Sequence, residues 1–221
     1  MSEQAELPDA VRIFPLPNVV LFPDVELPLH IFEPRYREMV SDALAADRLI
    51  GMVLLRGDWR KDYHGAPEVF PLGCVGRIET FSELPDGRSN LVLRGERRFR
   101  ICAELPGRAY RQARVEWQPE GGDPSAEVVA TNLRLRSSVS RLLARRERAM
   151  SPDLWERLPR ATALLVNTLA SVLDLAAIEK LALLECDDAI ARADRLIEIL
   201  EFHLADNSSV SPMSRDEEPR H

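Results

Sequence analysis

Residues 13–39 read IFPLPNVVLFPDVELPLHIFEPRYREM, and this stretch carries the densest set of structural signals in the chain. Apolar residues alternate with prolines, which favours short strands and turns because proline donates no backbone N–H. Pro28 keeps the strand predicted at 25–31 away from the centre of a sheet. Pro34 suits the first turn of a helix, where a missing N–H costs nothing. The stretch therefore predicts a strand that leads directly into a helix over 34–46.

The chain on either side of this stretch is rich in predicted strands up to residue 117. Apolar and polar residues alternate over 98–103 and 110–117, a period of two that is typical of half-buried antiparallel strands. The run Pro85-Asp86-Gly87 predicts a turn, because proline presets φ and glycine accepts a positive φ. Further strands are expected at 11–14, 49–55, 74–81 and 90–94.

A break at 118–124 (QPEGGDP) separates this region from a helical one. Asp123 is the expected N-cap of a helix that reaches residue 148. Later helices are predicted over 153–158, 161–173, from a cap at Asp174 to 185, and over 187–204. The expected fold is therefore α+β. Its predicted parts are a flexible start (1–10), a β-rich subdomain (11–117), a linker (118–124), a helical bundle (125–205) and a disordered tail (206–221).

Charge and composition exclude several classes of protein. The formal net charge of the 221 residues is −7. Neither half of the chain is basic, which makes nucleic-acid binding unlikely. No apolar run reaches the roughly 18 residues of a membrane span, and residues 1–10 do not resemble a secretory signal, so we expect a cytoplasmic protein with no membrane partner. The three cysteines form no CxxC motif and are expected to be reduced thiols.

Long motifs in this sequence resemble the N-terminal, substrate-binding domain of the Lon protease family, in its free-standing bacterial form. The resemblance rests on residues 13–23 and 27–39, on the glycine-bearing GCVGRI at 73–78, on the hairpin segments at 84–89 and 91–101, and on 180–200. It implies a PUA-like β pseudo-barrel followed by a helical bundle. It also implies a domain that recognises protein substrates in proteolysis.

The motif residues have ordinary structural interpretations, such as filling a core, shaping turns or holding the strand-to-helix corner. We expect such structural roles for Phe14, Pro15, Leu16, Phe22, Pro23, Leu27, Pro28, Leu29, Phe32, Glu33, Pro34, Arg35, Tyr36, Gly73 and Gly76.

Catalytic motifs of a complete Lon protease are missing from this sequence. The phosphate-binding loop of an ATPase needs a Gly-Lys pair, but Lys61 follows Arg60 and Lys180 follows Glu179. Ser125 follows a pair of glycines, but a nucleophilic serine also needs a base, and the only lysine beyond it is Lys180 in a predicted helix. We therefore expect no enzyme activity, no ATP, no cofactor and no metal site.

The best candidate for a recognition loop is 57–71, which places four aromatic or imidazole side chains among polar residues between two strands. Exposed aromatic residues on a loop can anchor an extended peptide. The alternative is that Trp59 and Phe70 simply cover the end of the barrel. The candidate peptide-binding residues are Trp59, Tyr63, His64 and Phe70.

The leading hypothesis is a non-catalytic module that binds unfolded or apolar protein segments, or one specific protein partner, as a monomer or weak dimer. The alternative is a PUA-type RNA-binding module, because residues 88–100 and 134–148 carry five and six arginines. Residues 174–206 carry nine acids and three bases, so the second basic segment could pack beside acidic helices. A hydrolase with an unrecognised acid pair is the third interpretation.

Overall fold

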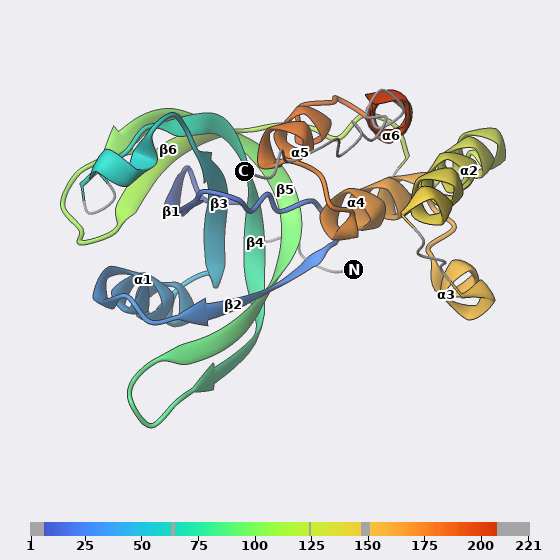
Figure 1. Cartoon of the computed structure of the whole chain (residues 1–221). Coiled ribbons are helices and arrows are strands. Elements are labelled where there is room, and N and C mark those ends of the chain that lie inside the picture. Colours follow the sequence, from blue (N-terminus) through green and yellow to red (C-terminus); the bar gives the residue numbers. More distant parts are fainter. Residues whose placement is uncertain (1–6, 63–64, 124, 147–150, 207–221) are drawn as a thin grey trace, which may run out of the picture.

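The computed structural model describes residues 7–62, 65–123, 125–146 and 151–206 (Figure 1). Six strands form one mixed sheet in this part of the chain. Their bounds are β1 (Ala10–Leu16), β2 (Glu26–Ile31), β3 (Leu49–Leu55), β4 (Val69–Glu83), β5 (Ser89–Leu105) and β6 (Arg111–Trp117). The expected N-terminal segment lies largely outside the described residues, and so does the tail beyond residue 206.

The sheet has the order β2-β5-β4-β3-β1-β6, and β6 also returns to pair with β5. Only β1 and β3 are parallel, and the other pairs are antiparallel. The second pairing of β6, with β5, curls the sheet back on itself into an irregular pseudo-barrel (Figure 1). The predicted α+β class and β pseudo-barrel are confirmed.

The strands β4 and β5 are longer than the sequence predicts. The two strands expected at 90–94 and 98–103 are one strand of 17 residues, which follows the curl through irregularities in its pairing with β4 and β6. Beyond the barrel, 77–83 of β4 and 89–94 of β5 continue with β2 as a three-stranded extension. We call this extension the arm, and its hairpin tip projects from the molecule (Figure 1).

Six α-helices and one short 3₁₀ helix, η1 (Trp59–Asp62), complete the described chain. Helix α1 follows β2 directly, as predicted, with Pro34 in its first turn. The remaining helices form the bundle at the other side of the barrel (Figure 1). The helices are α1 (Pro34–Ala45), α2 (Val129–Arg145), α3 (Pro152–Arg157), α4 (Thr162–Val172), α5 (Ala177–Leu184) and α6 (Ala189–Asp206).

Two predicted helix caps are wrong. Helix α2 begins at Val129, and Asp123 instead accepts hydrogen bonds from the N–H and hydroxyl of Ser125 at 2.9 and 2.7 Å. Helix α5 is capped at Ala176, whose N–H donates to Glu179 at 2.8 Å, and not at Asp174. A short acidic side chain can satisfy nearby backbone N–H groups in a turn as well as at a helix start, so its presence alone does not locate the cap.

The larger hydrophobic core joins the barrel to the bundle. One cluster of buried residues includes Phe22 and Tyr36 from the β-rich region together with Leu135 and Leu165 from the helices. A second cluster fills the barrel around Phe99, which is fully buried. The two predicted subdomains therefore share one continuous hydrophobic core.

Two glycines allow segments of the β-rich region to pack closely against one another. A Cβ atom at Gly95 would lie 2.0 Å from the carbonyl oxygen of Phe22, and one at Gly73 would lie 2.3 Å from that of Met52 and 2.9 Å from the Phe99 ring. Any side chain at these positions would displace the backbone or the central aromatic ring. The glycine-bearing motif at 73–78 is thus needed for close approach inside the barrel.

The arginine-rich helix α2 packs beside the acidic helix α6. Arg134 pairs with Asp194 at 2.8 Å, and Arg141 pairs with Glu201 at 2.6 Å. Each pair joins residues 60 positions apart, so the two helices run parallel. The basic segment at 134–148 therefore has acidic partners within the fold, as expected if it packs beside the acidic helices.

Candidate protein-binding surfaces

The predicted recognition loop lies between β3 and β4, as expected. Trp59 opens η1 and is half-buried, with the guanidinium of Arg60 4.8 Å from its ring centroid. Phe70 is the second residue of β4 and is half-buried, with Arg56 5.8 Å from its ring. Tyr63 and His64 lie outside the described residues. Both rings lie beside arginine side chains, and the peptide-binding role of the loop stays a prediction.

A hollow of about 360 Å³ opens beside this loop at the end of the barrel. Val69 and Ile101 line it and pack against the cluster around Phe99. Arg111 closes part of the rim, because it donates to the carbonyl of Pro67 at 2.7 Å and to Glu104 at 3.0 Å. This end of the barrel is therefore held by polar contacts around a small apolar floor.

The strand-to-helix corner contains the polar motif residues in contact with one another. Arg35 donates to Glu33 at 3.0 Å, and its guanidinium lies 4.7 Å from the centroid of Tyr36. The Tyr36 ring in turn packs 4.3 Å from that of Phe14. These contacts orient α1 against β1, which is a structural role.

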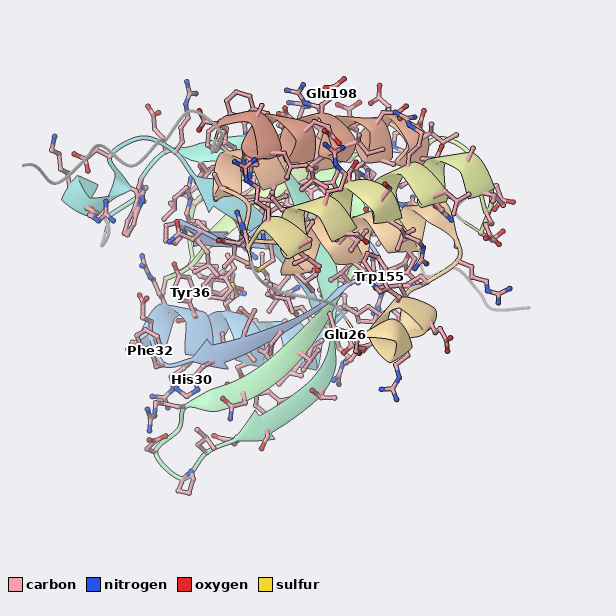
Figure 2. All side chains as sticks on the ribbon, turned by 45° about the vertical axis from the view of Figure 1, so that its right-hand side comes forward. Glu26, His30, Phe32, Tyr36, Trp155 and Glu198 are labelled. Carbon is pink, nitrogen blue, oxygen red and sulfur yellow. The ribbon has the colours of Figure 1, made fainter. Side chains whose placement is uncertain are left out.

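Phe32 departs from the structural role expected for its motif. Its neighbours Ile31 and Tyr36 are buried, but Phe32 is 59% exposed. Glu26, Pro28 and His30 precede it at every second position along β2 and are also exposed (Figure 2). The His30 and Phe32 rings are stacked with centroids 6.2 Å apart. The motif therefore presents a partly apolar row to solvent.

This row borders a shallow hollow of about 390 Å³ on the solvent face of the arm, which we call the arm groove. Pro28 pairs with Val92 and His30 with Asn90, and the Nδ1 atom of His30 lies 2.7 Å from Asn90 Oδ1. Phe81 of β4 also borders the hollow, but it pairs with Leu91 and through it with Leu29, so its 39% exposed ring lies on the opposite face of the arm from His30. The arm groove is lined by Pro28, His30, Thr80, Phe81, Asn90 and Val92 among others.

One long side of the arm groove is an edge of the sheet. Strand β2 stands at the end of the strand order and pairs with β5 alone. The backbone groups on its other side have no strand partner in the sheet, and such an edge can accept an added strand. Sequence analysis missed this surface because alternation in a strand does not tell which strand ends a sheet.

A largely buried polar cluster joins the β-rich region to the bundle, and we call it the arginine junction (Arg98, Glu120, Asn167 and Arg192). Both arginines contact Glu120, Arg98 at 2.6 Å and Arg192 at 3.1 Å. Arg192 also donates to Asn167 at 2.8 Å, and Asn167 donates to the carbonyl of Pro23 at 3.0 Å. Both arginines also donate to backbone carbonyls at the end of α5, Arg98 to that of Leu184 and Arg192 to that of Leu183.

The predicted lack of a serine–lysine pair fits the local contacts. The Ser125 hydroxyl donates to Asp123, whereas the Lys180 ammonium donates to the carbonyl of Ser171 at 2.8 Å. Partial burial lowers the pKa of Lys180, although Asp174 acts in the opposite direction. Burial raises the pKa of the Cys74 thiol. Within the described residues, no group of three or more potential metal ligands is present.

A curled mixed sheet fused to a helical bundle defines the class of this α+β domain. The sequence model of the ATP-dependent protease La (LON) substrate-binding domain matches residues 10–201. The chain therefore belongs to this family, as the sequence motifs predict. No helix in the described part of the chain is long and apolar enough to cross a membrane.

Relatives and solved structures agree with this assignment. The chain is 30% identical over 205 residues to the Lon protease of Paraburkholderia phytofirmans and 26% identical over 211 residues to that of Cytophaga hutchinsonii. It covers about 25% of the length of each, whereas they match 89% and 90% of this chain.

The Lon N-terminal domain protein from Xanthomonas campestris has 27% identity and a TM-score of 0.63, over 86% of this chain and 97% of that one. The N-terminal domain of the Mycobacterium avium complex Lon protease shares the fold with a TM-score of 0.64, over 88% of this chain and 99% of that one.

Proposed function

We propose that this chain is a non-catalytic recognition module that binds exposed apolar or unfolded segments of other proteins through the arm groove. The observation that carries the proposal is the 59% exposed Phe32, which stacks on His30 at the end of the edge strand β2, beside the arm groove. Large apolar side chains that gather at a sheet edge are a common feature of surfaces that bind extended chains.

The mode of binding follows from the geometry of the edge. An unfolded segment is extended, so its N–H and C=O groups can pair with those of β2. Its alternate side chains would then lie on the same face as the arm groove, next to Pro28, His30 and Phe32. Pro28 offers no N–H in the middle of the strand, which limits the pairing to a short segment and disfavours uncontrolled addition of strands.

The side-chain part of the binding energy would come mainly from the Phe32 ring. The backbone pairing does not depend on sequence, so it suits a module that accepts many clients. Burial of the exposed part of this ring contributes on the order of 1 to 2 kcal/mol, which is about tenfold in affinity. Membership of a substrate-binding domain family supports the same function.

The test is binding of a fluorescent peptide in which Val or Phe alternates with Ser, measured by anisotropy with the full chain. We expect Phe32→Ser, alone or together with Phe81→Ser, to weaken binding at least about tenfold. Val172→Ser is the matched control, because Val172 is a 68% exposed apolar residue on α4, away from the arm. Circular dichroism verifies that each variant is folded. Equal affinity of the folded double variant and the wild type would refute the proposal.

The predicted recognition loop offers a competing surface for the same function. In that case Trp59→Ala with Tyr63→Ala would abolish peptide binding without unfolding the domain, and the phenylalanine double variant would bind normally. The two pairs of variants thus distinguish the arm groove from loop 57–71.

A further inference from the structure

A second apolar groove lies between α5 and α6, on the bundle. Four residues join the two helices, which therefore run antiparallel, and Glu179 near the start of α5 contacts His203 near the end of α6 at 2.7 Å. The hollow between them measures about 410 Å³. We call it the bundle groove, and its apolar lining consists of Ile178, Ala182, Ile199 and Phe202.

The apolar lining is unusually exposed for a helical surface. Phe202 is 65% exposed and Ile178 is 54% exposed, and both border the same hollow. Single exposed apolar residues are ordinary on protein surfaces, but two large ones across one groove mark an interaction site. The groove is well separated from the arm groove, since Glu198 on α6 lies at the top of the view and Phe32 after β2 lies well below it at the left (Figure 2).

Acidic residues dominate the rim of the bundle groove. Glu179 and Glu198 line it directly. Helical spacing puts Glu185 in the row of Ile178 and Ala182, and Asp206 in the row of Ile199 and Phe202, and both acids are exposed. Arg195 is the one arginine in the lining, and it pairs with Glu198 at 2.9 Å. The rim therefore keeps an excess of negative charge.

We propose that the bundle groove binds a basic amphipathic helix of a partner protein. A groove between two antiparallel helices accepts a third helix, whose apolar residues at i, i+3 or i+4 and i+7 fill the floor. Lysine or arginine residues on the flanks of that helix complement the acidic rim. Phe202 is the anchor of the contact, because it combines the largest exposed apolar side chain of the groove with a position beside the hollow.

The probe is a labelled peptide in which leucines and lysines are arranged at helical spacing, titrated with the full chain. A peptide with glutamate in place of lysine tests the charge, and a scrambled leucine–lysine peptide tests the helical pattern. We expect Phe202→Ser to weaken binding of the leucine–lysine helix about tenfold, and Glu185→Lys with Glu198→Lys to weaken it several-fold. Leu133→Ser, a 63% exposed apolar position on α2, is the matched control and should bind like the wild type.

Several outcomes would overturn the proposal. If the glutamate peptide binds as tightly as the leucine–lysine helix, the acidic rim does not select a basic partner. If the scrambled peptide binds as tightly, the groove does not recognise a helix. A dimer in light scattering that Phe202→Ser converts to a monomer would identify a second copy of the chain as the occupant. The result is independent of the arm groove, since Phe32→Ser with Phe81→Ser should leave binding of the helix unchanged.

Discussion

Replacement of Arg192 by alanine should be among the most destabilising changes in the chain. Its side chain is fully buried, and it contacts Glu120, Asn167 and two backbone carbonyls at the end of α5. Arg98 still reaches Glu120 in the variant, but the Arg192–Glu120 ion pair is lost and the side-chain oxygen of Asn167 loses its donor, whereas the carbonyl of Leu183 keeps the backbone N–H of Cys186 at 3.3 Å. Each buried group left without a partner costs about 1 to 3 kcal/mol.

These losses add to about 4 kcal/mol, within the range of about 3 to 5 kcal/mol for breaking a buried ion pair. A domain of this size has on the order of 5 to 15 kcal/mol of stability, so the variant should fold but with a small margin. With a denaturant slope of about 2 kcal/mol per M, the midpoint of urea unfolding should fall by about 2 M. Circular dichroism at the helical band measures it.

The matched control is Arg195→Ala, three residues further along the same helix. Arg195 is half-exposed and pairs with an exposed Glu198, an interaction worth about 0.3 kcal/mol. If Arg192→Ala does not fold, Arg192→Lys provides a milder variant, since lysine keeps the charge but cannot reach all the acceptors. An Arg192→Ala midpoint no lower than that of Arg195→Ala would refute the structural role of the arginine junction.

Three further predictions concern chemistry and partners. Purified protein should hydrolyse neither ATP nor casein, because neither lysine lies in a phosphate-binding loop, and activity that co-elutes with the chain through successive columns would contradict this. In the native protein, Ellman's reagent should react first with the exposed Cys102, slowly with Cys186, and with Cys74 only after unfolding. The reason is that burial raises the pKa of the Cys186 and Cys74 thiols. Rapid reaction of all three thiols in the native protein would contradict this burial. Binding of the apolar peptide should change little between about 50 and 200 mM salt, whereas RNA held by several phosphate contacts would lose at least about a hundredfold, so a steep salt dependence would favour the RNA alternative.

Much of the architecture could be predicted from local patterns. The succession of strand, Pro34 and helix depends on proline geometry, which acts within a few residues, and the structure places α1 as expected. The alternation over 110–117 corresponds to β6. The caps at Asp123 and Asp174 were wrong because the same side chain can stabilise a turn or a helix start, and only packing selects between them.

The candidate site was less accessible to sequence reasoning. An aromatic loop at 57–71 is visible in the sequence, but a phenylalanine in a strand or helix looks like a core residue. Phe32, Phe81 and Phe202 are exposed because no other element of the fold covers them. The residues next to each of them in the sequence do not indicate whether such a cover exists.

The amino-acid sequence alone determined the family, the α+β class and the order of strands and helices, because these follow from short motifs and from periodicity over neighbouring residues. Tertiary structure decided which strand became the edge of the sheet and which helix faces remained uncovered. It also brought Arg98, Glu120 and Arg192 together in one buried cluster. Such features arise from contacts between residues far apart in the chain, and no local pattern records which surfaces those contacts leave open.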